Sequence, residues 1–225
     1  VSSIFLRDGF SLHVHGFQVM PALMTDKVND QLISTCKTRC EQEGEVIFNN
    51  VKKAESRHND GLRVQLSTDK IDGTAPFKAT LAERLKDGFP LHKVDSMVAL
   101  LSKPGCKAQL AHTDYTPKTL ANATDDKMPL ACLVALMDGT ALDVWPGAIR
   151  GFDKSRRVYH PMQVKLNKGD TLIFRGDLVH AGAACGEVAN VRLHAYMDVE
   201  GVKRPKHGDG VEETHFIEKR ILGRE

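Results

Sequence analysis

The sequence predicts a mainly β fold, either a sandwich or a barrel, supported by two helices near the N-terminus. Beyond about residue 90 the helical period disappears, and short strand-like runs alternate with turn signals. Before that point, two segments carry apolar residues at helical spacing. A chain of 225 residues fits one β domain of this kind. We expect a single domain with helical support over about 1–90, a β core over about 91–200 and a tail over 201–225.

The N-terminal part is expected to form a short strand and then two helices. The strand is "GFQVM" (16–20). The helices are expected over 21–44 and 76–88, because each segment has a proline near its start and a glycine at its end. The apolar stripe of the first helix consists of Leu32, Cys36 and Cys40.

The rest of the chain reads as strands separated by turns such as "PG", "DGT", "NKGD" and "CGE". Strands of this length and spacing are typical of a β-sandwich or barrel, with the helices packed against it. The expected strands are 94–103, 107–114, 129–137, 141–145, 162–166, 171–177, 178–184 and 190–199.

The composition is that of a globular protein with an apolar core. Hydrophobic residues make up 41% of the chain, charged residues 27%, and the net charge is +2, so neither disorder nor a polyanion partner is indicated. No apolar run reaches the roughly 18 residues of a membrane span. The start "VSSIFLRDGF" looks trimmed and shows no signal peptide. We expect a soluble intracellular protein of the cytoplasm or nucleus, with no membrane partner.

The five cysteines do not indicate a disulfide framework, because they are odd in number and irregularly spaced. Cys36 and Cys40 stand one helical turn apart, which would also suit a metal or redox pair, but they belong to the apolar stripe of the first helix. Cys132 lies in an apolar run. Reduced thiols in the core are the simpler interpretation.

Three His-x-Asp pairs are candidates for a metal site, and two of them read as loops. His58 and Asp60 are followed by glycine, a pattern typical of a tight turn closed by side chain to backbone hydrogen bonds. His207 and Asp209 lie in a glycine-punctuated tail, with only His215 downstream as a further ligand.

The third pair, in "QLAHTDYTP", ends an expected strand. His112 and Asp114 would point to the same face, with Thr113 on the other. Two histidines and one carboxylate hold ferrous iron while leaving positions open for a bidentate cosubstrate and dioxygen. His180, in "GDTLIFRGDLVHAGA", offers the second histidine from another expected strand. Taken alone, His180 could equally be a core histidine satisfied by a hydrogen bond.

The expected strand 190–199 alternates between an apolar and a polar face. A buried arginine on the polar face needs an anionic partner. For Arg192, a dicarboxylate cosubstrate could be that partner through a bidentate fork, and an ion pair with Asp198 or Asp177 is the alternative. The apolar face holds Val191, Leu193, Ala195, Met197 and Val199, and the polar face holds Arg192, His194, Tyr196 and Asp198.

In this order, His112-x-Asp114, His180 and Arg192 resemble the iron(II)/2-oxoglutarate-dependent dioxygenases, which have a double-stranded β-helix (jelly-roll) core. The run "LVALMDGTALDVWPGAIRG" followed by "KLNKGDTLIFRGDLVHAGA" is similar to the phytanoyl-CoA and prolyl hydroxylase branches. The resemblance covers about residues 90–200, and the N-terminal helices fit the usual support of this family.

The resemblance implies His112, Asp114 and His180 as the iron(II) ligands and Arg192 as the partner of the distal carboxylate of 2-oxoglutarate. The implied activity is an oxygenase that consumes O2 and 2-oxoglutarate, hydroxylates or oxidatively demethylates a substrate, and releases succinate and CO2. Metal affinity is expected to fall at acidic pH because the ligands must be deprotonated. The resemblance leaves open the substrate (small molecule, peptide or nucleobase), the oligomeric state and a requirement for ascorbate.

Two departures from the family pattern put the branch in doubt. After "PG" at 146–147 the phytanoyl-type pattern often continues with serine and histidine, whereas this chain has Ala148 and Ile149. Two residues beyond the arginine some branches place serine, whereas this chain has His194.

Two other classes of function remain as alternatives. A cupin-like metal-binding protein or pseudoenzyme would keep the metal without oxygenase activity, but it would have no use for Arg192. A zinc hydrolase would need a general-base carboxylate close to its ligands, as in His-Glu-x-x-His, and the chain has none. A dioxygenase acting on nucleic acid is a variant of the main hypothesis.

Residues near the mouth of the site are harder to assign. Arg57, Arg63 and Gln65 in a hairpin ahead of the core, Trp145, and the basic loop 150–157 could border it, or could be ordinary surface and core residues. The tripeptide "RGD" at 175–177 is better explained by a strand turn than by integrin binding.

Overall fold

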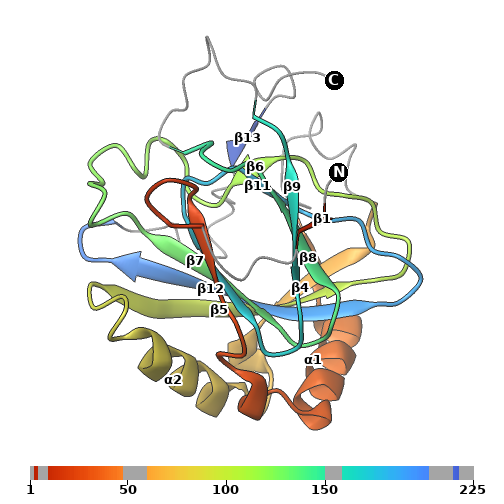
Figure 1. Ribbon diagram of the computed structural model, residues 1–225. Helices are drawn as coiled ribbons and strands as arrows, with labels where there is room; N and C mark the ends of the chain where they lie inside the picture. The colour runs from red at the N-terminus through yellow and green to blue at the C-terminus, as the bar shows by residue number, and fades with distance from the viewer. Residues whose placement is uncertain (1–2, 5–9, 48–59, 150–158, 203–214, 218–225) are drawn as a thin grey trace.

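The computed structural model describes residues 3–4, 10–47, 60–149, 159–202 and 215–217. In this part of the chain two β-sheets face each other, and two helices cover the outer face of the larger sheet (Figure 1). The larger sheet contains, in spatial order, β2 (Phe17–Met20), β10 (Thr171–Arg175), β7 (Leu130–Ala135), β12 (Asn190–Val199), β5 (His92–Ser102), β4 (Arg63–Ser67) and β3 (Glu45–Val46). The smaller sheet contains β1 (Ser3–Ile4), β9 (Met162–Leu166), β8 (Thr140–Val144), β11 (His180–Gly182), β6 (His112–Thr113) and β13 (His215–Phe216).

Most of the strands expected from the sequence are present, and β9 and β12 have the expected bounds. The expected strand over 107–114 is wrong, because only its residues 112 and 113 pair as β6. The residues before β6 form hydrogen bonds outside a ladder: the Lys107 amide donates to Asp60 Oδ2 at 2.6 Å, and the Gln109 amide donates to the Gly182 carbonyl at 2.9 Å. This irregular segment connects β5 of the larger sheet to β6 of the smaller sheet.

The first helix begins later than the sequence predicts: α1 spans Asp30–Glu43, not 21–44. Asn29 is its N-cap, and the Asn29 side chain accepts a hydrogen bond from the Leu32 amide at 2.9 Å. Upstream, a 3₁₀ turn over Thr25–Lys27 follows Ala22, whose φ is 55°. That segment is bonded to the turn between β9 and β10, which competes with helix formation.

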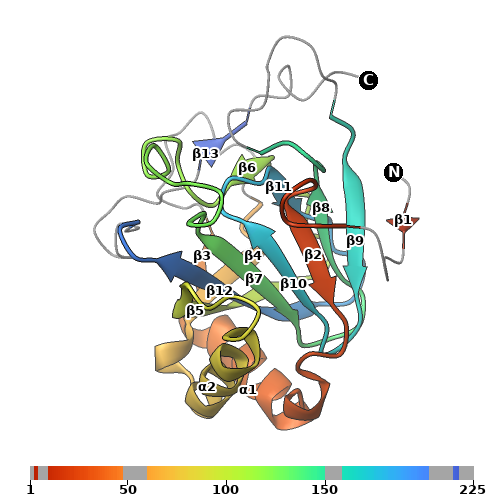
Figure 2. The same cartoon turned by 60° about the vertical axis from the view of Figure 1, so that its left-hand side comes forward.

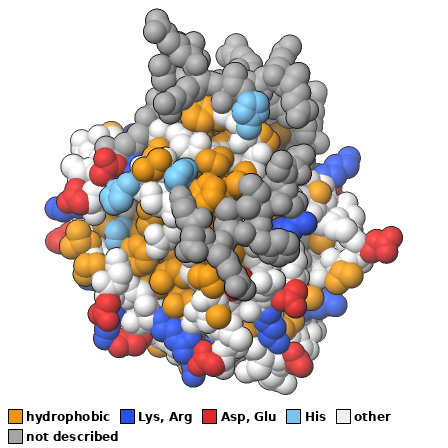
Figure 3. Space-filling view, viewed as in Figure 1, with side chains coloured by type: hydrophobic (Ala, Val, Ile, Leu, Met, Phe, Trp, Pro, Cys, Tyr) orange, Lys and Arg blue, Asp and Glu red, His pale blue; other side chains and the backbone are white. Residues whose placement is uncertain are grey.

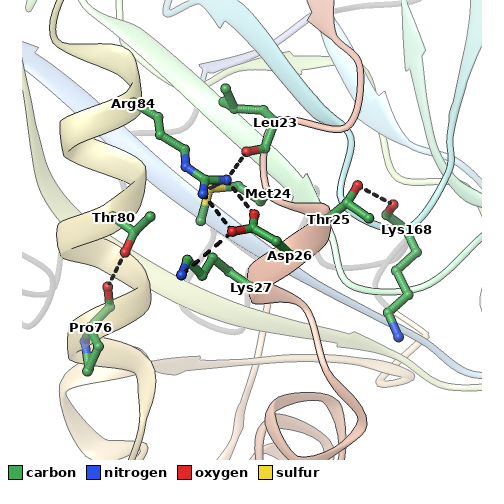
Figure 4. Close-up of polar contacts among 9 residues, drawn as sticks. All are labelled: Leu23, Met24, Thr25, Asp26, Lys27, Pro76, Thr80, Arg84 and Lys168. Carbon is green, nitrogen blue, oxygen red and sulfur yellow. Dashed lines mark hydrogen bonds and ion pairs between the residues drawn. The ribbon is translucent and has the colours of Figure 1, made fainter.

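The second helix, α2 (Thr74–Leu85), is tied to that 3₁₀ turn by Arg84 (Figure 4). The Arg84 guanidinium forms a bidentate ion pair with Asp26, at 2.7 and 2.8 Å, and also donates to the Leu23 carbonyl. The hydrogen bonds from Arg84 hold the pKa of the Asp26 carboxyl down at about 2. These contacts fix α2 against the N-terminal segment.

Two apolar layers hold the elements together. One lies between the helices and the larger sheet, and it includes Leu81 and Leu85 of α2 with Leu193 of β12. The other lies between the two sheets, and it includes Leu133 of β7 and Phe174 of β10. Both views of the ribbon show the helices at one end of the molecule and β6, β11 and β13 at the other (Figures 1 and 2).

Four of the five cysteines are buried, and Cys185 is half-buried. Cys36 and Cys40 face the larger sheet from α1, and Cys132 lies in the centre of β7, all three buried. All five cysteines are free thiols. The interpretation of the first pair as part of an apolar stripe is confirmed.

Among the described residues, no helix is long and apolar enough to cross a membrane.

Candidate metal centre

Two strands of the smaller sheet place two histidines side by side. His112 on β6 and His180 on β11 are directly opposite in the antiparallel register, and their ring centroids are 4.4 Å apart. Asp114 lies just beyond the end of β6. One possible ligand atom from each of these three residues lies within 4.8 Å of the other two, and all three side chains are buried. The structure therefore brings together the three residues selected from the sequence.

Backbone carbonyls fix both imidazole rings. The Nδ1 atom of His112 lies 2.7 Å from the Leu110 carbonyl, and that of His180 lies 3.0 Å from the Leu178 carbonyl. Since a carbonyl only accepts, each Nδ1 carries a proton, and in the neutral ring each Nε2 carries the lone pair. Metal-binding histidines are usually oriented in this way, so the rings have the tautomer that a metal requires.

The charges of the three groups also suit a cation. Burial would raise the pKa of the Asp114 carboxyl, but His180 and His194 outweigh burial and hold that pKa well below its ordinary value. Burial, followed by the nearby His180, lowers the pKa of His112 to about 3. For His180, burial would lower the pKa, but Asp114 raises it. At neutral pH the carboxylate is ionised and His112 is neutral.

His194 contacts the cluster, although the sequence predicted only its place on the polar face of its strand and its departure from a family pattern, and gave it no role. Its Nε2 lies 3.2 Å from Asp114 Oδ2, while His180 Nε2 lies 3.5 Å from Asp114 Oδ1. The His194 ring packs against Tyr196, with centroids 4.6 Å apart. One carboxylate oxygen is therefore engaged by His194, and the other faces His180. The alternation of β12, which puts His194 on the same face as Arg192, was the signal that could have identified it.

The turn before β11 is held by a buried ion pair. Arg175, whose side chain is 3% exposed, contacts Asp177 through Nε and Nη2, at 2.8 and 2.9 Å. Its Nη1 contacts Asp125 at 2.9 Å, and the Asp125 side chain is 58% exposed. The interpretation of "RGD" as a strand turn fits these contacts, because its arginine is bonded inside the protein. His180 follows this turn, three residues after Asp177.

Gly176 of the same turn packs against the segment that carries Asp114. A Cβ at Gly176 would lie only 2.4 Å from Cδ2 of the buried Tyr115 ring. The Tyr115 amide donates to the Gly176 carbonyl at 3.1 Å, and the Tyr115 hydroxyl donates to Asp198. The segments that carry Asp114 and His180 therefore meet at a glycine.

Arg192 lies on the same face of β12 as His194, two residues or about 7 Å along the strand. It is 4% exposed and donates from Nη1 to Ser102 Oγ at 2.8 Å. In the part of the chain that the structure describes, Arg192 forms no ion pair, and its Nε has no hydrogen-bond partner. The ion pairs with Asp198 or Asp177 that the sequence left open are not formed. Burial, followed by the like charge of Arg63, lowers the pKa of Arg192 to about 9.

The other candidate residues have different positions. Arg63 is 4% exposed and lies beside Arg192, so it is not a surface residue. Trp145 is partly buried against an apolar cluster that includes Val179. Asp60 accepts from the Leu62 amide at 3.0 Å, as expected for a turn. Arg57, His58, the loop 150–157, His207 and Asp209 lie outside the described residues, as does the side chain of His215.

No protein-family model matches the chain, and no curated protein matches it. Several solved structures match the chain. SnoK, a non-heme alpha-ketoglutarate-dependent carbocyclase from nogalamycin biosynthesis, matches with a TM-score of 0.65 and 18% sequence identity, over 93% of this chain and 92% of SnoK. A prolyl-4-hydroxylase from Pseudomonas putida matches with a TM-score of 0.55 and 14% identity, over 84% of this chain and 96% of its own.

HygX from Streptomyces hygroscopicus, solved with nickel, 2-oxoglutarate and hygromycin B bound, matches with a TM-score of 0.56 and 13% identity, over 84% of this chain and 85% of HygX. At these identities the likeness shows the fold. The double-stranded β-helix with N-terminal helices, expected from the sequence, is confirmed. The phytanoyl-CoA/prolyl hydroxylase branch stays a prediction.

Proposed function

We propose that the protein is an iron(II)- and 2-oxoglutarate-dependent oxygenase that hydroxylates or oxidatively demethylates an organic substrate. The observation that carries the proposal is a pair of features on the facing strands of the two sheets. His112, Asp114 and His180 form a buried cluster of possible ligands, and Arg192, a buried cation without an acidic partner in the described chain, lies close by on β12. These features suit a site in which His112, Asp114 and His180 would hold a metal and Arg192 would bind a carboxylate of the cosubstrate.

The donor set fits ferrous iron. Two imidazole nitrogens and one carboxylate form the three-ligand arrangement typical of non-heme iron(II) oxygenases, with positions left open for other molecules. The ring tautomers and the ionised Asp114 are ready for a cation. When bound, iron(II) with 2-oxoglutarate and O2 would supply the oxidation, which yields succinate and CO2 and transfers one oxygen atom to the substrate.

The residues of the chain would bind the metal and 2-oxoglutarate and hold them in position. His112, Asp114 and His180 would hold the metal, and His194 would keep one oxygen of the Asp114 carboxylate turned away from it. Arg192 would bind the distal carboxylate of 2-oxoglutarate through a charge-assisted fork. The burial of all five side chains keeps bulk water from the reaction.

The structural neighbours support the cosubstrate and indicate where to look for the substrate. SnoK is described as alpha-ketoglutarate-dependent, and HygX was solved with 2-oxoglutarate bound. Nogalamycin biosynthesis and hygromycin B make small organic molecules the first candidates to screen. The face seen in Figure 3 has hydrophobic side chains over its centre and charged side chains along its lower and outer rim. The net charge of the chain is only +2, so a polyanion is not the first candidate to screen.

The test is succinate release from 2-oxoglutarate by the purified protein with iron(II) and air, in the presence and absence of candidate substrates. The Asp114→Ala variant should release none, whereas Asp87→Ala, which removes an exposed carboxylate at the end of α2, should match the unchanged protein. Calorimetry with zinc(II) in place of iron measures 2-oxoglutarate binding without turnover. Silence in both assays would overturn the proposal and leave a cupin-like metal-binding protein.

A further inference from the structure

The hydroxyl of Ser102 lies between two buried arginines from different strands. Ser102 ends β5, and Arg63 of β4 is directly opposite it in the antiparallel register. Arg192 belongs to β12, the neighbour of β5 on the other side. Arg63 Nη1 and Arg192 Nη1 each lie 2.8 Å from Ser102 Oγ. All three residues are at most 4% exposed.

The hydrogen bonds around this hydroxyl leave its proton available. A serine hydroxyl has two lone pairs and one hydrogen. Both lone pairs of Ser102 accept from guanidinium groups, which only donate. Among the described residues, Ser102 Oγ donates to no acceptor. The Ser102 O–H is therefore set to donate to a further group.

The two guanidiniums differ in how far their own donors are satisfied. Arg63 Nη2 donates to the carbonyls of Lys107 (2.9 Å), Gly182 (3.4 Å) and Ala183. Within the described ranges, Arg192 donates only to Ser102, and the Nε atoms of both arginines are buried without a partner. Arg63 is thus anchored to the backbone, whereas Arg192 still has donors to offer.

The charges of this cluster call for an anion. Two cations share one hydroxyl, and no carboxylate of the described chain forms an ion pair with either of them. Buried charges without a counter-ion are costly. A cavity of about 290 Å³ is lined in part by Ser102 and Arg192, so a small ligand has room beside them.

We propose that Ser102 is a binding residue for the distal carboxylate of 2-oxoglutarate, together with Arg192, and that Arg63 is the residue that positions Ser102. The hydroxyl donates its proton to one carboxylate oxygen while Arg192 donates to the carboxylate as well. Arg63 occupies a lone pair of Ser102, which fixes the hydroxyl as a donor, and adds a second positive charge behind it. This inference rests on the proposed function, because it takes 2-oxoglutarate as the anion.

The experiment measures ligand binding to the zinc(II)-loaded protein by calorimetry, with two probes. 2-Oxoglutarate carries the distal carboxylate, and 2-oxobutanoate lacks it. In Ser102→Ala the dissociation constant for 2-oxoglutarate should rise roughly tenfold to a hundredfold, as expected when one hydrogen bond to a charged group is lost. The constant for 2-oxobutanoate should stay unchanged. Ser96→Ala, an exposed serine on the same strand, is the matched control and should change neither.

Two further variants separate binding from folding. Ser102→Thr keeps the hydroxyl and should restore most of the affinity for 2-oxoglutarate. Arg63→Gln leaves Ser102 in place and should weaken 2-oxoglutarate but not 2-oxobutanoate. Equal weakening of both probes in Ser102→Ala, or unchanged 2-oxoglutarate binding in Ser102→Ala or Arg63→Gln, would overturn the inference.

The same measurements distinguish a wrong assignment of the cosubstrate from a wrong assignment of Ser102. If the unchanged zinc(II)-loaded protein binds no 2-oxoglutarate, the proposed function is wrong before any variant is compared. If it binds 2-oxoglutarate and Arg192→Ala abolishes that binding while Ser102→Ala does not, the proposed function stands and the role of Ser102 is refuted.

Discussion

Replacing Asp177 with asparagine is expected to destabilise the turn that carries His180. Asparagine keeps the shape of the side chain but removes the negative charge that faces the Arg175 guanidinium at two points, 2.8 and 2.9 Å away. Arg175 is buried on its strand and cannot turn to water without disrupting β10. In the variant, Asp125, which is mostly exposed, is the remaining acidic partner of the buried Arg175 among the described residues.

The size of the effect follows from burial. Removing one partner of a buried ion pair costs about 3–5 kcal/mol, and because Asp125 still contacts Arg175 we expect the lower end, about 3 kcal/mol. For a domain of this size 1 kcal/mol corresponds to roughly 2–4 °C in Tm. The Tm of Asp177→Asn should therefore fall by about 6–12 °C. Asp125→Asn removes a mostly exposed partner and should lower stability by at most about 1 kcal/mol.

The assay is thermal unfolding of the metal-free protein by calorimetry at pH 7, with zinc(II) affinity as a second measurement. Because the turn positions His180, the zinc(II) affinity of Asp177→Asn should fall roughly tenfold to a hundredfold, as for other groups that orient metal ligands. Equal, small shifts in Tm for Asp177→Asn and Asp125→Asn would refute the reasoning, since it depends on the difference in burial between the two carboxylates.

Metal-dependent stabilisation should require Asp114: zinc(II) at a hundred times its dissociation constant should stabilise the unchanged protein by about 2.7 kcal/mol, and calorimetric unfolding of Asp114→Ala should show no such gain. Metal affinity should fall as the pH falls, starting at His180, because its raised pKa makes this ring take up a proton at a higher pH than an ordinary histidine, whereas His112, with a pKa of about 3, stays neutral. Zinc(II) binding near pH 6.5 should therefore displace a proton from His180 but not from His112, so that at most about one proton is released per metal ion and the number rises as the pH falls. Calorimetry in buffers of different ionisation enthalpy measures this number, and release of two protons, or of none, would contradict the assignment. Gly176→Ala should lower stability by about 1–3 kcal/mol through overpacking against the buried Tyr115 ring, and an unchanged denaturant midpoint would show that the ring can move.

The sequence predicted an element correctly where its local pattern was not opposed by bonds to distant parts of the chain. The alternation of β12 gave its bounds and, as far as Met197, both of its faces, because one face meets the helices and the other faces the interior. Val199, expected on the apolar face, lies after a shift in register and packs with Tyr115 instead. The start of α1 could not be predicted from Pro21, because the upstream residues bond to the distant turn at Gly169 and Asp170 instead of forming a helical turn. Such tertiary bonds override local propensity and have no local signature.

The site could be predicted to the extent that its members have distinctive residue types in a recognisable order. His112, Asp114 and His180 satisfied that condition. Ser102 and Arg63 did not, since an isolated serine or arginine reads as ordinary until the register of β4, β5 and β12 brings them together.

Because the side chains of β12 alternate between two faces, the strand places Arg192 and His194 between the sheets only when it pairs in the correct register. A slip of one residue in its pairing would turn Arg192 and His194 into the apolar layer beneath the helices and turn Val191 and Leu193 toward the smaller sheet. Burying a cation among aliphatic side chains is so unfavourable that the slipped chain would not persist. A stable but misregistered form is thereby excluded, and in a preparation of this protein the fraction that is folded should also be the fraction that binds metal.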